Sequence, residues 1–220
     1  MQIAIDGPAA SGKSTVAKIL ASKLKATYID TGAMFRAVTL YLLKQEGLIT
    51  RVELWDQNLA DIEIQLEMTE SGQKVFLNQE DVTEAIRSQE VSRQVSKVAA
   101  NLKVREYLLK EQRRLAKDQD VVMDGRDIGT TVLPQANYKF FMIASSRVRA
   151  QRRFDELSKK GHSPISIEQI EKDIQARDEY DRNRKYAPLK KAEDAIEIDT
   201  SNMTIDEVVE KMLTFISRNA

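Results

Sequence analysis

Gly7-Pro8-Ala9-Ala10-Ser11-Gly12-Lys13-Ser14-Thr15 fits the pattern G-x-x-x-x-G-K-[ST] of a phosphate-binding loop. The apolar run Ile3-Ala4-Ile5 precedes this segment and predicts a buried strand, while apolar residues at helical spacing follow it from Ser14 to Lys25. Between a strand and a helix, successive backbone N–H groups and the helix N-terminus attract anions. An ordinary Gly/Ser turn before a helix is the alternative, but this order of elements favours a cradle for the phosphates of a nucleoside triphosphate.

The residue types in this loop predict separate roles in binding ATP and Mg²⁺. Gly7 and Gly12 permit backbone conformations that other residues resist. Lys13 supplies a point charge to the β- and γ-phosphates, and Ser14 offers a hydroxyl ligand for Mg²⁺. Asp124 ends a later apolar run, where it either caps a turn or helps to hold hydrated Mg²⁺. Beside a phosphate-binding loop we expect the metal role for Asp124, acting through water.

Short apolar runs alternate with helical patterns along most of the chain. They predict five strands, at 3–5, 27–30, 121–123, 138–143 and 195–199. The intervening helical patterns include 33–45 and a last helix that opens with Thr204 and Glu207 in capping-box spacing. Strands separated by helices indicate βαβ units, so we predict an α/β fold of the P-loop NTPase type: three layers around a central five-stranded parallel sheet.

One stretch departs from this alternation. Residues 62–68 alternate apolar and polar, a turn is expected at 70–73, a second strand at 74–77 and a second turn at 78–81. This pattern predicts a small antiparallel meander inserted between helices.

Composition restricts the class of protein. Of the 220 residues 42% are hydrophobic, and 34 Lys and Arg balance 34 Asp and Glu, which argues against non-specific nucleic-acid binding. The absence of cysteine excludes disulfides and thiol catalysis. No signal peptide or membrane-spanning run is recognisable. We expect a soluble cytoplasmic protein, and a monomer because no long apolar stripe stands out.

Arginines in separate segments indicate a second anionic substrate. Arginine forks bind phosphate groups in a bidentate way and keep their charge. Arg177, Asp181 and Arg184 stand at i, i+4 and i+7, which would place them on one face if the segment is helical. An exposed face of ion pairs is the alternative for this run. The arginines concerned are Arg36, Arg105, Arg126, Arg177 and Arg184.

A second basic cluster follows the strand at 138–143 and contains Arg147, Arg149, Arg152 and Arg153. With Lys159-Lys160-Gly161 after it, this helix suits either a lid that closes over ATP or a solvated helix with a turn. His162, the one histidine, is expected at the surface rather than as a catalytic base.

Two further motifs are specific: Asp124-Gly125-Arg126-Asp127-Ile128-Gly129-Thr130, and Arg177-Asp178 with Asp181-Arg182-Asn183-Arg184 through Ala187-Pro188-Leu189. Together with 5–15, 30–36 and 104–105, they resemble the bacterial cytidylate kinase family along nearly the whole chain. That resemblance implies transfer of the γ-phosphoryl group of ATP to CMP or dCMP with Mg²⁺, giving ADP and CDP or dCDP in pyrimidine nucleotide metabolism.

The resemblance also implies an organisation and a set of site residues. It implies a core at 1–36, 84–150 and 185–220, a monophosphate-binding region at 37–83 with a β insert around 62–83, and a short helical lid region at 151–184. The implied substrate-binding residues are Thr31, Arg36, Arg105, Arg126, Asp127, Arg177, Asp181 and Arg184. The implied catalytic residues are Lys13, Arg126, Arg153, Arg177 and Arg184, with Arg153 as the lid arginine.

Two details qualify this acceptor site. Asp181 is expected near the cytosine or the sugar, and an acid that accepts a hydrogen bond from the cytosine amino group would reject uracil. Phe35 departs from the tyrosine of the family pattern, which removes at most one hydroxyl hydrogen bond.

Other functions remain open from the residues alone. A GTPase is disfavoured because no Asn-Lys-x-Asp segment is present. A kinase for another nucleotide or for a small metabolite such as shikimate is the nearest alternative. A non-catalytic nucleotide switch and an RNA-binding protein are alternatives from other classes.

Overall fold

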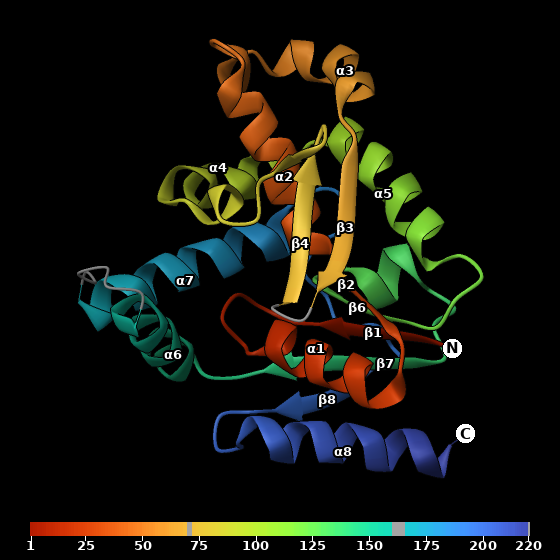
Figure 1. Cartoon of the computed structure of the whole chain (residues 1–220). Helices are drawn as coiled ribbons and strands as arrows, with labels where there is room; N and C mark the ends of the chain where they lie inside the picture. The colour runs from red at the N-terminus through yellow and green to blue at the C-terminus, as the bar shows by residue number, and fades with distance from the viewer. Residues whose placement is uncertain (70–71, 160–165, 220) are drawn as a thin grey trace. The chain divides into compact units, whose positions relative to one another are not determined.

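A five-stranded parallel sheet organises the computed structural model of the chain, which describes residues 1–69, 72–159 and 166–219 (Figure 1). Its strand order is β2-β6-β1-β7-β8, and the apolar runs predicted as strands form all five. Their bounds are β1 Gln2–Asp6, β2 Thr27–Asp30, β6 Val121–Gly125, β7 Tyr138–Ile143 and β8 Ile196–Asp199. The prediction of a central five-stranded parallel sheet is confirmed.

Strand β1 lies in the middle of this sheet. It pairs with β6 from Gln2 opposite Val121 to Asp6 opposite Gly125, and its other edge pairs with β7. The chain continues from β1 to β2 on one side of the sheet and from β7 to β8 on the other, so the carboxyl ends of β1 and β7 form a topological switch point, where open α/β sheets bind ligands. The phosphate-binding loop begins directly after the end of β1.

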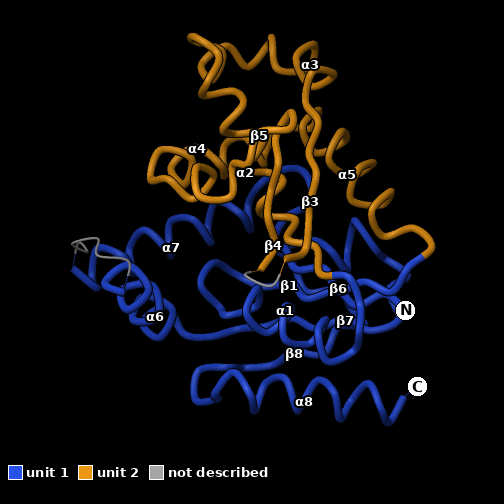
Figure 2. Tube along the Cα trace, in the orientation of Figure 1, with its two compact units in different colours: residues 1–27, 119–220 blue, residues 28–118 orange. Residues whose placement is uncertain are grey.

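The chain forms two compact units, residues 1–27 with 119–220 and residues 28–118 (Figure 2). The first unit contains most of the sheet and, in its described part, the helices α1 Lys13–Leu24, α6 Ser146–Lys159, α7 Ile167–Asn183 and α8 Ile205–Arg218. Helices α6 and α7 lie side by side and bury Ala150 against Ile170 and Ile174. Helix α8 starts with the predicted capping box, Thr204 with Glu207.

The second unit is mostly helical. Its helices are α2 Thr31–Lys44, the short α3 Trp55–Asn58, α4 Gln89–Ala99 and α5 Leu102–Ala116. Helix α2 begins two residues before the predicted position because the Asp30 side chain accepts a hydrogen bond from the Ala33 backbone N–H. Trp55 is buried, and its indole N–H donates to the Leu48 carbonyl.

The predicted meander is present as the three-stranded antiparallel sheet of β3 Ile64–Thr69, β4 Gly72–Leu77 and β5 Glu80–Asp81. Strand β4 begins at Gly72, within the segment predicted as a turn, because Gly72 and Gln73 continue the pairing with Thr69 and Met68. Asn78 and Gln79 both have positive φ, which makes the second turn two residues long and leaves Glu80 and Asp81 in a strand.

No helix within 1–69, 72–159 and 166–219 is long and apolar enough to cross a membrane. The domain boundaries predicted at 36/37, 83/84, 150/151 and 184/185 do not coincide with the boundaries of the two compact units and stay predictions.

Candidate active site

The phosphate-binding loop packs tightly against the sheet. A Cβ atom added to Gly7 would lie 2.3 Å from the Met142 carbonyl oxygen, so no side chain fits there. Gly12 has φ 87°, a left-handed conformation that glycine adopts without steric cost, and it directly precedes α1. The glycines of the motif are therefore required by a close approach at Gly7 and by a backbone conformation at Gly12.

Three cations contact carbonyl groups of this loop. Lys13 Nζ donates to the Pro8 oxygen at 3.1 Å. Arg149 Nη1 donates to the Ala9 oxygen at 3.1 Å, and Arg152 Nη1 donates to the Ser11 oxygen at 3.3 Å. Both arginines come from α6, the helix that the sequence predicts as part of a lid.

A hydroxyl and a carboxylate suitable for Mg²⁺ meet beside the loop. Ser14 Oγ donates to Asp124 Oδ2 at 2.7 Å, and Asp124 is buried at the end of β6. Within the described ranges no three His, Asp or Glu side chains form a metal cluster. This oxygen pair fits Mg²⁺, which takes few protein ligands and completes its shell with water and substrate phosphates.

Asp6, at the end of β1, holds the segment that follows β6. Its two carboxylate oxygens accept hydrogen bonds from the backbone N–H groups of Ile128 and Gly129, both at 2.8 Å. Burial raises the pKa of Asp6 to about 7, although the two hydrogen bonds act in the opposite direction. Residues Ile128–Val132 form a turn of π-helix at this point.

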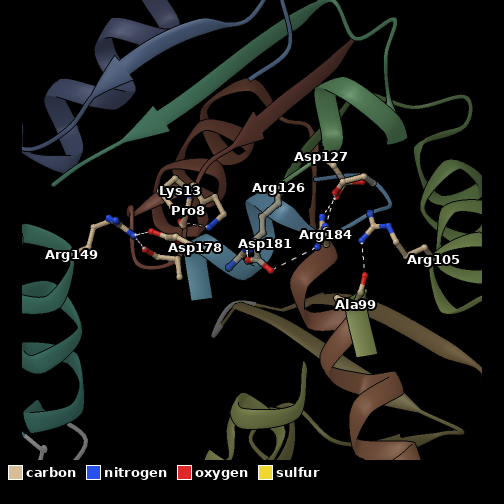
Figure 3. A network of polar contacts seen from close by, with 12 residues as sticks. Pro8, Lys13, Ala99, Arg105, Arg126, Asp127, Arg149, Asp178, Asp181 and Arg184 are labelled. Carbon is tan, nitrogen blue, oxygen red and sulfur yellow. Dashed lines mark hydrogen bonds and ion pairs between the residues drawn. The ribbon is translucent and has the colours of Figure 1, made fainter. Parts of the chain in front are cut away.

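Arginine and aspartate side chains from the segment after β6 and from the end of α7 form a buried network (Figure 3). Arg126 Nε donates to Asp181 Oδ2, and Asp181 Oδ1 lies 3.9 Å from Arg184 Nη1. Arg184 Nη2 in turn donates to Asp127 Oδ1 at 3.2 Å. The side chains of Asp127, Asp181 and Arg184 are each no more than 6% exposed. Four predicted acceptor residues are thus brought together.

The predicted helical face at 177, 181 and 184 is only partly helical. Helix α7 ends at Asn183, and Arg184 has an extended backbone. The chain turns back here because the Leu189 N–H donates to the Asp181 carbonyl and Arg184 Nε donates to the Ala187 carbonyl. Arg184 nevertheless reaches Asp181. Arg177 lies in α7 and is half-buried.

Residues 28–118 contain three more predicted acceptor residues. Thr31 is buried in the first turn of α2. Arg36 Nη1 donates to Ser92 Oγ at 3.0 Å. The buried Arg105 donates to the Ala99 carbonyl at 3.1 Å, and its guanidinium carbon lies 5.2 Å from the centre of the Phe35 ring. Phe35 therefore provides a cation–π partner, which a tyrosine ring would also supply.

The family model described as cytidylate kinase matches residues 3–218. The chain belongs to the cytidylate kinase family. Cytidylate kinase of Bacillus subtilis (strain 168) is 49% identical over 220 residues, with 100% of this chain and 98% of that protein covered. Cytidylate kinase of Geobacillus sp. (strain WCH70) is 51% identical over 217 residues, covering 99% and 96%.

Solved structures support the fold of this cytidylate kinase family member. A gluconokinase from Sinorhizobium meliloti 1021 aligns with a TM-score of 0.52 at 14% identity, covering 99% of this chain and 91% of that one. At this identity the likeness concerns the fold alone, and it agrees with the P-loop kinase architecture predicted from the sequence.

The basic cluster on α6 is divided between two environments. Arg149 and Arg152 contact the phosphate-binding loop, whereas Arg153, the predicted lid arginine, pairs with Glu156 on its own helix at 2.8 Å and is 37% exposed. The role of Arg153 stays a prediction. The Gly161 and His162 part of the predicted lid lies outside the described residues.

Sequence reasoning did not identify Asp6, Arg149 or Asp178 as site residues. Asp6 had one available signal, a charged residue at the end of an otherwise apolar strand next to the loop. Asp178 lies between Arg177 and Asp181 in a quoted motif, and the structure buries it in an ion pair with Arg149 at 2.6 Å. Nothing in the sequence pairs these two residues.

Proposed function

We propose that this member of the cytidylate kinase family transfers the γ-phosphoryl group of ATP to CMP or dCMP, using the residues described above. The residue assignment rests on one observation: the phosphate-binding loop lies next to the segment that carries Arg126 and Asp127. Asp6 pairs with Gly125 across β1 and β6, so the phosphate-binding loop and the Arg126–Asp127 segment leave the sheet side by side. A cradle for donor phosphates is thus next to a cluster suited to a second anion.

The loop at 7–15 would bind the donor. Its backbone N–H groups, the N-terminus of α1 and the Lys13 ammonium would neutralise the ATP phosphates. Ser14, and Asp124 through water, would hold Mg²⁺, which supplies further charge neutralisation when bound. The 2.7 Å hydrogen bond between Ser14 and Asp124 supports this role because it keeps the two oxygens side by side.

The acceptor would bind to the arginine and aspartate network. Arg126, Arg177 and Arg184 are suited to the phosphate of CMP because guanidinium groups bind phosphate oxygens in a bidentate way. Asp181 and Asp127 would orient those arginines or accept hydrogen bonds from the nucleoside. We also assign acceptor binding to Thr31, Arg36 and Arg105.

The chemical step needs no strong base. A phosphate oxygen of CMP, already ionised at neutral pH, would attack the γ-phosphorus in line, with ADP as the leaving group. Positioning of the two substrates and neutralisation of the charge that develops would supply most of the rate enhancement. Arg126, Arg177, Arg184 and Lys13 are the groups assigned to this neutralisation, with Arg153 as the proposed lid contribution.

A coupled ADP-release assay with a panel of acceptors tests the proposal. We expect release that depends on CMP or dCMP, and much less with UMP, AMP or shikimate. Lys13→Ala should reduce kcat by orders of magnitude. Lys23 is exposed on the same helix, so the control variant Lys23→Ala should leave kcat unchanged.

Two results would contradict this assignment. Nucleotide binding without acceptor-dependent ADP release would indicate a switch rather than a kinase. Near-normal kcat in Lys13→Ala would contradict the role of the loop in binding the ATP phosphates.

A cytoplasmic location, where ATP and CMP would be available, is part of the same proposal.

A further inference from the structure

One buried arginine contacts three separate parts of residues 1–27 and 119–220. Arg149 Nε donates to the Ala144 carbonyl, in the turn after β7, at 2.9 Å. Its Nη1 donates to the Ala9 carbonyl of the phosphate-binding loop and, at 2.6 Å, to the Asp178 carboxylate of α7. Figure 3 shows Arg149 and Asp178 facing each other from the two helices.

The pair of Arg149 and Asp178 is almost fully removed from solvent. Their side chains are 5% and 3% exposed. Asp178 Oδ1 has no hydrogen-bond partner in the part of the chain that the structure describes, so Arg149 is the cation that offsets the burial of this carboxylate. Removing one charge from such a pair leaves the other buried and uncompensated, which destabilises the contact between the two elements that carry the pair.

The contact at Ala9 affects the direction of the neighbouring N–H group. In a trans peptide the C=O of one residue and the N–H of the next point in opposite directions. No peptide bond among the described residues is cis, so fixing the Ala9 oxygen against Arg149 turns the Ala10 N–H to the opposite side. The contacts of Lys13 at Pro8 and of Arg152 at Ser11 act on the loop in the same way.

Helix α7 carries Asp178 between two proposed acceptor residues, Arg177 and Asp181. We propose that Arg149 is a positioning residue that couples the phosphate-binding loop to α7 through Asp178, so that donor and acceptor phosphates are held in register for transfer. This inference rests on the proposed function, because the acceptor roles of Arg177 and Asp181 belong to it. The coupling itself is carried by the contacts of one guanidinium group.

Conservative variants and a double-mutant cycle test the coupling. Arg149→Lys keeps the charge but not the planar fork, and Asp178→Asn keeps the shape but not the charge. Since a 1 Å misplacement costs about a hundredfold in rate, we expect each variant to lose about tenfold in kcat/KM for both ATP and CMP. The double variant should lose about tenfold as well, because both changes break one connection.

Arg147→Ala is the matched control. Arg147 also joins α6 to α7, through Glu168 at 3.0 Å and Glu171 at 3.6 Å, but it is 55% exposed and, among the described residues, pairs with these two glutamates rather than with the loop. A general need for ion pairs between these helices would therefore affect Arg147→Ala as well. We expect this variant to keep the kcat and both KM values of the wild type.

The readout separates coupling from stability and from the proposed function. Thermal unfolding of every variant identifies losses that come from unfolding alone. The coupling is overturned if Asp178→Asn leaves kcat/KM for ATP unchanged, if Arg149→Lys leaves kcat/KM for CMP unchanged, or if the double variant shows the product of the two single losses. If Arg149→Lys fails to fold, the effect of Asp178→Asn on ATP decides the question. Failure of the proposed function would instead appear as an inactive wild-type protein.

Discussion

Asp181 is the residue at which the proposed acceptor specificity is best tested. Its buried carboxylate accepts a hydrogen bond from Arg126 and lies beside Arg184. Asp181→Ala would leave these arginines misoriented and would remove the expected acceptor for the cytosine amino group or the sugar. We therefore expect KM for CMP to rise far more than KM for ATP in steady-state kinetics.

Asp173→Ala on the exposed side of the same helix serves as the control for Asp181. Its kinetic constants should match those of the wild type. Equal increases of both KM values in Asp181→Ala would argue against an acceptor role.

The titration of Asp6 makes the free energy of unfolding of the protein depend on pH. Burial is the largest cause that raises its pKa, from 3.8 to about 7. Between these values the folded protein holds a proton that the unfolded chain has released, so the free energy of unfolding falls as pH rises. The contribution of the protonated group is complete below 3.8 and is lost as pH passes through about 7.

Asp6→Asn should lack this pH dependence because the amide does not titrate. Urea unfolding at several pH values between 3.8 and 7 measures the slopes of the two proteins. Asp199→Asn is the control. Hydrogen bonds from Ser201 lower the pKa of the exposed Asp199 carboxyl from its ordinary value of 3.8, so this group titrates below the pH range of the experiment. Parallel profiles for wild type and Asp6→Asn would show that Asp6 does not titrate here.

At the scale of the element, α8 shows how a terminal cap contributes to stability. Thr204 Oγ1 accepts from the Glu207 N–H, and Glu207 accepts in return from the Thr204 N–H. Thr204→Ala should lower the free energy of unfolding by about 1 kcal/mol, because a backbone N–H at the N-terminus of the helix loses its side-chain acceptor. Chemical denaturation measures this change, and kcat should stay unchanged.

Thr214→Ala tests whether the cap, rather than the loss of any threonine, is responsible. Thr214 is exposed in the body of the same helix, so its replacement should change the free energy of unfolding by less than about 0.5 kcal/mol. Equal losses in the two variants would contradict the cap.

At the scale of the whole molecule, the exposed apolar residues bear on the oligomeric state. The large apolar side chains that are exposed in the described ranges come from separate segments: Met1, Val52, Met68, Leu102, Tyr180 and Phe215. Stable homodimers usually bury a continuous apolar patch. We expect a monomer of 25.0 kDa in light scattering at all concentrations, and twice that mass would contradict the prediction.

Much of this molecule was predictable because its signals are local in the chain. Strand, loop and helix around Lys13 follow from residues within one segment, and so does the capping box at Thr204. The short apolar runs predicted every strand of the parallel sheet. The end of α7 was not predictable from spacing, since hydrogen bonds from Leu189 and Arg184 turn the chain at that point.

The amino-acid sequence by itself determined the order of the elements, the phosphate-binding loop and the motifs of the cytidylate kinase family. Only the tertiary structure decided which charged residues support that loop. Asp6 is 123 residues from Gly129, and Arg149 is 140 residues from Ala9. Such partners meet through the register of β1 with β6 and the packing of α6 on α7, and neither is encoded in local spacing. Burial then sets the strength of these contacts, because a charge removed from water needs its partner.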